Sequence, residues 1–106
     1  MDAKDLEFFK NRLEEERSRI LKNIEAINSE LAVIAAEDEI DDIEDMAELK
    51  VENDRDKETL KILLRELKDI DDALKKIANG TYGIDEKSGK PIPKERLMAN
   101  PAARTA

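Results

Sequence analysis

The sequence contains no cysteine, no histidine and no tryptophan, and its aromatic side chains are one tyrosine and two phenylalanines. The lack of cysteine excludes disulfides, thiolate metal sites and cysteine nucleophiles together. No apolar run approaches the ~20 residues that a membrane-spanning helix needs, and no signal-peptide pattern opens the chain. These absences favour a cytoplasmic protein without a membrane partner.

The 106-residue sequence is rich in charged residues, which make up 43% of it, whereas aromatic residues make up 3%. A chain with so little bulky apolar material cannot fill a thick globular core. It is either disordered or built from long helices that share one thin apolar seam.

The net charge of −8 comes from one short segment, residues 37–48, with the sequence EDEIDDIEDMAE. This segment holds eight acidic residues and no basic one, and the other 19 acidic residues balance the 19 Lys and Arg. Because acidic surfaces repel phosphate backbones, we expect no direct sequence-specific binding of nucleic acid. A basic surface or a metal ion is the partner that such a segment attracts.

Apolar residues repeat every seven positions on both sides of this segment, as in helices that pack along one another. The pattern predicts an all-α fold, an antiparallel coiled-coil hairpin with arms of about 30 residues, or ~45 Å each. Asn53 and Asp56 are polar positions of the second arm, which either loosen the hairpin there or fix its register. The first arm carries Leu6, Leu13, Ile20, Ile27 and Ile34 beside Phe9, Ile24 and Leu31; the second carries Met46, Asn53, Leu60, Leu67 and Leu74 beside Leu49, Asp56, Leu63, Ile70 and Ile77.

Local signals mark the ends of the two arms. Asp2 or Asp5 can cap the first helix, and Gly80 can end the second in a left-handed conformation. We therefore predict a hairpin over residues 1–79 with its acidic tip at 37–48, followed by a small tail over 80–106. In the tail, 81–84 suits a short strand and 94–99 one or two helical turns.

The acidic segment has two chemical interpretations that the residues argue against. Catalytic carboxylates need a cleft that separates their pKa values, and a hairpin tip has none. A calcium loop needs a glycine and a bidentate glutamate in register, which are missing here. A third interpretation is a partner-binding tip, in which Asp42 and Asp45 share one helix face and Ala47 leaves room beside them. Acidic residues that merely complement a helix dipole give the same pattern.

The tail sequence GTYGIDEKSGKPIPKERLMANPAAR resembles the four-cysteine zinc-finger region of the DksA/TraR family of transcription regulators. The family's Asp-x-x-Asp-x-Ala tip motif matches Asp42, Asp45 and Ala47. The resemblance covers nearly the whole chain, but the zinc ligands are gone. Asp85 and Ser88 stand at the first two ligand positions, Ala106 at the third, and the sequence stops before the fourth. We therefore expect no metal and no cofactor, and a tail held by Tyr82, Ile84, Ile92, Leu97 and Met98.

The resemblance implies that the protein is a regulator rather than an enzyme. It would bind RNA polymerase through the secondary channel, as a monomer or weak dimer, with the acidic tip approaching the catalytic centre. Basic residues of the tail region would dock on the channel rim: Lys75, Lys76, Lys94, Arg96 and Arg104. Two alternatives stay open: a helical scaffold or dimerisation module without transcriptional effect, and a degenerate relative that occupies polymerase without regulating it.

Some family members bind guanosine tetraphosphate together with polymerase, through basic side chains near the finger. At the matching positions this sequence has Asp69 and Asn100, with Lys68, Lys75, Lys76 and Arg104 nearby. A carboxylate repels a polyphosphate, and a neutral amide makes weaker hydrogen bonds than a cation. The sequence therefore predicts action without the alarmone.

Overall fold

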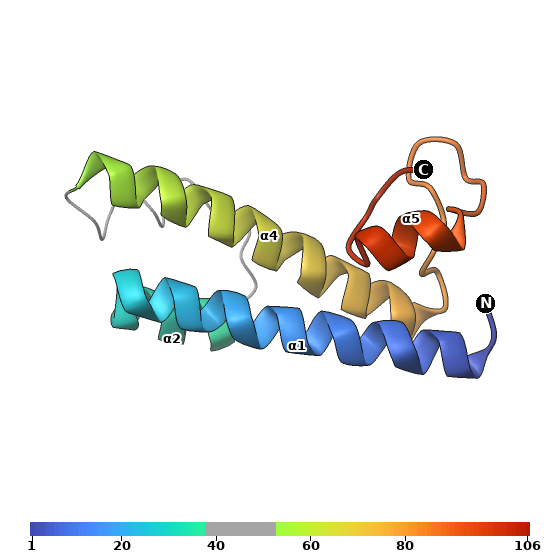
Figure 1. Ribbon diagram of the computed structural model, residues 1–106, viewed down its shortest axis with the longest axis horizontal. Helices are drawn as coiled ribbons and strands as arrows, with labels where there is room; N and C mark the ends of the chain where they lie inside the picture. Colours follow the sequence, from blue (N-terminus) through green and yellow to red (C-terminus); the bar gives the residue numbers. More distant parts are fainter. Residues whose placement is uncertain (38–52) are drawn as a thin grey trace. The chain divides into compact units, whose positions relative to one another are not determined.

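The computed structural model describes residues 1–37 and 53–106, and four helices lie in these ranges: α1 (Ala3–Ile27), α2 (Ser29–Glu37), α4 (Asp54–Asn79) and α5 (Lys94–Ala99). Helices α1 and α4 run side by side in opposite directions (Figure 1), which confirms the predicted all-α hairpin. In the described ranges β pairing is limited to one isolated antiparallel bridge, Ile84 to Pro91. No helix in them is long and apolar enough to cross a membrane.

The chain forms two compact units. One unit combines residues 1–16 with residues 69–106, and so contains the start of α1, the end of α4 and the tail. The other spans residues 17–68 and contains the end of α1, α2 and the start of α4. The predicted division at residue 80 into hairpin and tail stays a prediction.

The apolar seam supplies the interior of both units. In the first unit it includes Phe9 and Leu13 of α1, both fully buried, and in the second Ile24, Leu31, Leu60, Leu64 and Leu67. Each such side chain contributes roughly 1.5–3 kcal/mol by leaving water. The seam differs in detail from the predicted rows: Leu64 is buried, whereas Leu6, Ile27, Leu63, Leu74 and Ile77 are only half-buried.

Helix ends follow the local chemistry of the sequence. The carboxylate Oδ1 of Asp2 accepts the Asp5 amide at 2.9 Å and thus caps α1. At the end of α4, Gly80 has φ +77°, its amide donates to the Ile77 carbonyl, and the Thr81 amide donates to the Lys76 carbonyl. This pair of bonds is the Schellman motif, and it confirms Gly80 as the predicted end of the helix.

Asn53 caps α4 rather than occupying a seam position. Its Oδ1 accepts the amides of Arg55 at 2.9 Å and Asp56 at 3.2 Å. An asparagine at this position satisfies backbone donors that the first helical turn leaves without partners. The interpretation of Asn53 as a polar seam residue was therefore wrong.

The first arm is also not one continuous helix. It breaks at Asn28, whose Oδ1 accepts the Leu31 amide at 3.1 Å and caps α2. Helix α2 then lies back along α1, as a hydrogen bond from the Arg17 guanidinium to the Ala36 carbonyl at 3.4 Å shows. In a continuous helix these residues would be about 28 Å apart along the axis. The predicted 30-residue first arm is corrected to a 25-residue helix and a short returning one.

Candidate functional site

The predicted tip residues Asp42, Asp45 and Ala47 lie outside the described residues. The other sequence-predicted residues all belong to the first unit, where the end of α4 meets the tail. They fall into two groups, the three lost ligand positions and the five basic rim residues.

The tail keeps the frame of a small knuckle through backbone pairing. The Ile92 amide donates to the Gly83 carbonyl at 2.7 Å, and the Asp85 amide donates to the Lys90 carbonyl at 2.8 Å. Gly83 has φ +86°, and a Cβ there would clash with the Met1 Cε. The predicted strand at 81–84 is thus reduced to a single bridge, and α5 forms as predicted over 94–99.

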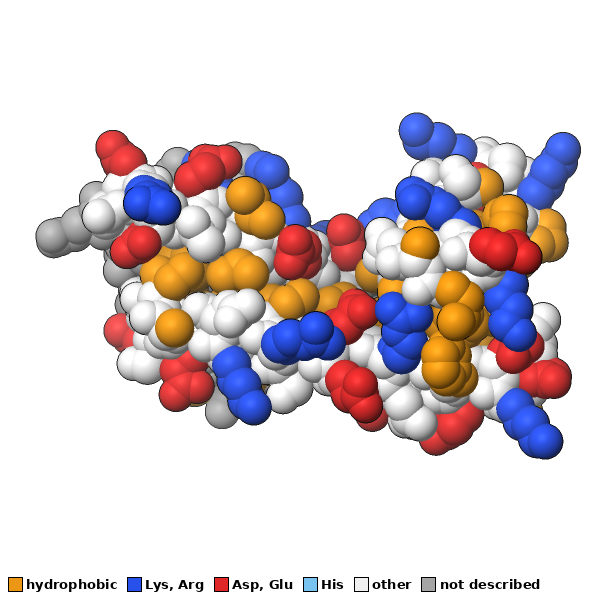
Figure 2. Space-filling view, viewed as in Figure 1, with side chains coloured by type: hydrophobic (Ala, Val, Ile, Leu, Met, Phe, Trp, Pro, Cys, Tyr) orange, Lys and Arg blue, Asp and Glu red, His pale blue; other side chains and the backbone are white. Residues whose placement is uncertain are grey.

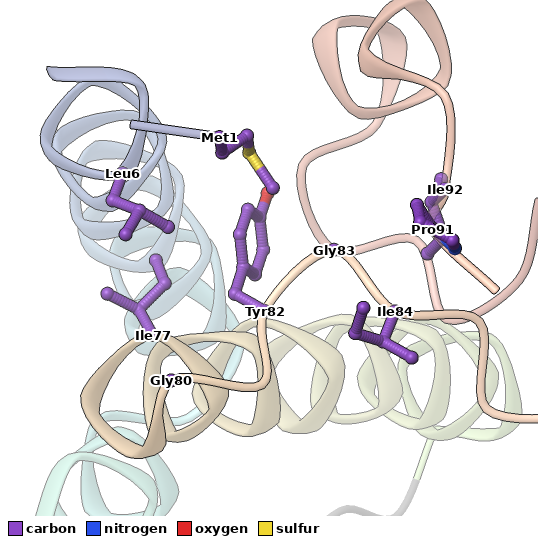
Figure 3. Close-up of a pocket in the computed structure, with 9 residues that line it drawn as sticks. All are labelled: Met1, Leu6, Ile77, Gly80, Tyr82, Gly83, Ile84, Pro91 and Ile92. Atoms are coloured by element: carbon purple, nitrogen blue, oxygen red, sulfur yellow. The ribbon is translucent and has the colours of Figure 1, made fainter. Parts of the chain in front are cut away.

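Apolar side chains fix this frame against the helices. Tyr82, Ile92 and Leu97 are buried as predicted, whereas Ile84 and Met98 are exposed, which corrects the predicted tail core. The Tyr82 hydroxyl donates a buried hydrogen bond to the Pro101 carbonyl at 2.7 Å, and its ring lies 5.7 Å from that of Phe9. Burial raises the pKa of Tyr82 to about 12. Figure 3 shows the Tyr82 ring extending toward Met1 at a pocket of about 260 Å³ with mostly apolar walls, which offers no grouping of catalytic side chains.

Asp85 is the buried acidic residue of the tail, with 8% of its surface exposed. Its Oδ1 accepts the amides of Lys87 at 2.7 Å and Ser88 at 3.1 Å, and its Oδ2 accepts the Ala106 amide at 2.9 Å. The bond from the Ala106 amide contributes most to a lowered pKa of Asp85, followed by the Ser88 and Lys87 amides. The carboxylate thereby joins all three lost ligand positions.

The donor set at these positions does not suit zinc. Both oxygens of Asp85 are engaged by backbone amides, the Ser88 hydroxyl accepts the Lys90 amide at 3.3 Å, and Ala106 has only a methyl group. Structural zinc sites use four thiolate or imidazole ligands. Across the described ranges, no group of three or more acidic or histidine side chains is arranged to hold a metal ion.

A charged cluster ties the tail to α4. The Arg104 guanidinium bonds Asp69 at 2.7 Å and Asp72 at 2.6 Å on the helix, and Glu86 in the tail at 3.0 Å. Lys76 also pairs with Glu86. Burial alone would lower the pKa of Arg104, but the bonds to Asp72 and Asp69 outweigh it and raise that pKa. The bond from Lys76, and after it that from Arg104, lowers the pKa of Glu86.

The predicted rim residues are therefore mostly engaged within the chain. Besides Arg104 and Lys76, Lys94 pairs with Asp5 at 2.9 Å, and Arg96 donates to the Thr105 carbonyl at 3.4 Å. Lys75 also makes an interaction within the described structure. Figure 2 shows Lys and Arg side chains interspersed with acidic ones around the tail, rather than a purely basic face.

Sequence reasoning missed the structural roles of Asp85, Glu86 and Asp72. For Asp85 a signal was present, because Asp followed by a Ser-Gly turn commonly bonds the backbone amides two and three residues on. For Glu86 and Asp72 no local signal exists, since their partner Arg104 is 18 and 32 residues away.

The chain is similar in sequence to bacterial proteins. An uncharacterized protein of Aquifex aeolicus (strain VF5) is 33% identical to it over 105 residues, which are 98% of this chain and 72% of that protein. The chain belongs to the family of this Aquifex protein. The uncharacterized protein YteA of Bacillus subtilis (strain 168) is 64% identical over 39 residues, but the match covers only 37% of this chain and 16% of YteA. No family model matches the chain.

One solved structure has a similar fold. Transcription factor DksA2 from Pseudomonas aeruginosa superposes on the chain with a TM-score of 0.73 at 27% sequence identity. The superposition covers 100% of this chain and 80% of that one. The fold is therefore DksA-like, which agrees with the resemblance seen in the tail sequence.

Proposed function

We propose that this protein is a member of the DksA/TraR family that regulates transcription by binding RNA polymerase and inserting the acidic segment 37–48 into its secondary channel. The likeness to the transcription factor DksA2 over the whole chain carries the proposal. The tail frame and the Asp-x-x-Asp-x-Ala sequence support it, because both resemble that family. Such a protein works as a regulator rather than an enzyme.

The proposed mechanism is electrostatic. Asp42 and Asp45 approach the polymerase active centre, where metal ions and basic side chains attract carboxylates. Contacts that differ between polymerase states shift the population of polymerase–promoter complexes. Eight acidic residues within 37–48 supply the charge for this attraction.

Docking outside the channel is assigned to the first unit. Lys94 is an exposed member of an ion pair, with 56% of its side chain exposed, and its bond to Asp5 raises the pKa of the Lys94 amine. An exposed pair of this kind contributes little stability and exchanges readily for an acidic group on a partner. Lys75, Lys76, Arg96 and Arg104 complete the proposed rim contact.

The deciding experiment is in vitro transcription with purified polymerase and the double substitution Asp42→Asn/Asp45→Asn. We expect the effect on transcription to be lost while polymerase binding stays near that of the unchanged protein. Because Asp→Asn keeps the size and shape of the side chain, we expect the free energy of unfolding to change by no more than ~0.5 kcal/mol.

The matched control is Glu44→Gln/Glu48→Gln, which removes the same charge from the same segment without touching the motif. It should keep most of the transcriptional effect. Equal activity of the motif variant and the unchanged protein would refute the role of the tip. If the unchanged protein neither binds polymerase nor alters transcription, the proposed function is wrong and the scaffold alternative gains, which equilibrium sedimentation then tests.

A further inference from the structure

The apolar residues of the tail account for only part of what holds it folded. Zinc knuckles draw much of their folding free energy from the metal, which joins ligands from two separate chain segments. Here the two segments are the turn at 85–90 and the last residues of the sequence. Of the five apolar residues expected to hold the tail, Ile84 is 40% exposed and Met98 44% exposed. Another group must join the two segments.

We propose that the Asp85 carboxylate is the central cross-link of the tail, a role that the zinc ion has in a zinc knuckle. One of its oxygens holds the turn through the Lys87 and Ser88 amides, and the other holds the chain at Ala106. The positions joined are the three at which the family pattern places metal ligands. A side chain at the first ligand position thus binds the backbone of the second and third directly.

Neighbouring contacts keep the carboxylate in place. The Gly89 amide donates to the Asp85 carbonyl at 2.9 Å, which closes the turn. The Glu86 amide donates to the Arg104 carbonyl at 2.9 Å, which keeps the end of the chain alongside. Charge-assisted bonds from amides to a carboxylate are roughly twice as strong as neutral ones. The ionised form of Asp85 is therefore the one that the folded tail selects.

The first test uses the unchanged full chain and follows the amide protons of Lys87, Ser88 and Ala106 by NMR as the pH is lowered. Charged side chains in and beside this turn include those of Lys87, Lys90, Glu86 and Arg104, and the charge of Lys87 lowers the pKa of Asp85. Because that pKa is lowered, the cross-link is complete above pH 3.8 and is lost only as the pH falls further. We expect the three protons to shift together with one midpoint below 3.8. Separate midpoints, or a midpoint above 3.8, overturn the proposal.

The second test substitutes Asp85→Asn, which keeps the shape but replaces one acceptor oxygen by a donor. Hydrogen exchange of the Ala106 amide should speed up at least tenfold, while far-ultraviolet circular dichroism keeps the helix signal of α1 and α4. The matched control Glu95→Gln removes a carboxylate from the exposed face of α5 and should leave the exchange rate unchanged. Wild-type protection of all three amides in Asp85→Asn overturns the proposal.

The third test adds a chelator, and then one equivalent of zinc, to the unchanged protein. Neither should move the three amide resonances, since no thiolate or imidazole is present to compete with the backbone. Loss of protection on chelation, or stoichiometric zinc binding at these amides, contradicts the proposal. None of these readouts involves polymerase, so the proposal stands or falls separately from the proposed function.

Discussion

Tyr82 links two ends of the tail through a single hydroxyl, which donates to the Pro101 carbonyl in a buried position. Its pKa is raised because the phenolate would have to sit where water cannot solvate it. Stability from the protonated form is complete below pH 10.0 and is lost as the pH rises through about 12. The residue therefore reports on the closed tail.

We expect the phenolate absorbance of the folded protein to appear with a midpoint near pH 12 rather than at the ordinary 10.0. The chain has one tyrosine and no tryptophan, so the signal has a single source. Tyr82→Phe serves as the control: it removes the absorbance change and lowers the free energy of unfolding by about 1 kcal/mol, the usual net value of a hydrogen bond. A midpoint at 10.0 in the folded protein would show that the hydroxyl is open to solvent.

Single residues also show how far the sequence determines local structure. Gly80 was predicted correctly because a left-handed helix end depends on the residue type itself. Asn53 was misread because its heptad position fits a seam, and only knowledge of where α4 begins reveals the cap. Asp85 was read as a lost ligand, although the same carboxylate suits backbone amides equally well.

At the scale of elements, the structure differs from the heptad prediction at Asn28, where the predicted single helix is broken. The seven-residue spacing continues through Asn28, so periodicity alone predicts one helix. The pair Asn28-Ser29 is the overlooked local signal, because both residue types favour helix starts over helix interiors. The hairpin itself was predictable, since it depends on two apolar stripes rather than on any one residue.

The return of α2 along α1 can be measured with spin labels, because the chain has no cysteine of its own. We expect labels at Ser18→Cys and Ala36→Cys to lie well inside the ~27 Å that a continuous helix would impose. Both residues line one groove between the two helices. A matched pair at Glu7→Cys and Glu25→Cys, both exposed, within α1 and equally far apart in sequence, gives the continuous-helix distance. Equal distances for the two pairs would contradict the break.

At the scale of the whole molecule, the prediction of alarmone-independent action gains structural detail. Arg104 and Lys76, two of the cations near the alarmone position in the sequence, are held by carboxylates of the chain. The Asn100 side-chain oxygen accepts the Ala102 amide at 3.2 Å. A polyphosphate would have to displace these partners, each bond to a charged group being worth roughly 1.5–3 kcal/mol.

We therefore expect guanosine tetraphosphate to leave the transcriptional effect of this protein unchanged, on polymerase whose other alarmone site has been removed. The control is polymerase with that site intact and without this protein, which shows that the alarmone is active in the assay. A dose-dependent gain on the altered polymerase would contradict the expectation. This prediction depends on the proposed function.

The first unit draws its residues from both ends of the sequence, with Lys94 bonded to Asp5 and Arg12 bonded to Met98. During synthesis the first sixteen residues emerge from the ribosome long before their partners do. At ~5–20 residues per second, on the order of 5 to 20 seconds pass before the tail is made. Phe9 and Leu13 stay without their final neighbours for that time, whereas residues 17–68 are contiguous and need no later segment. During translation, the unit of residues 17–68 is therefore complete before the unit that needs the tail.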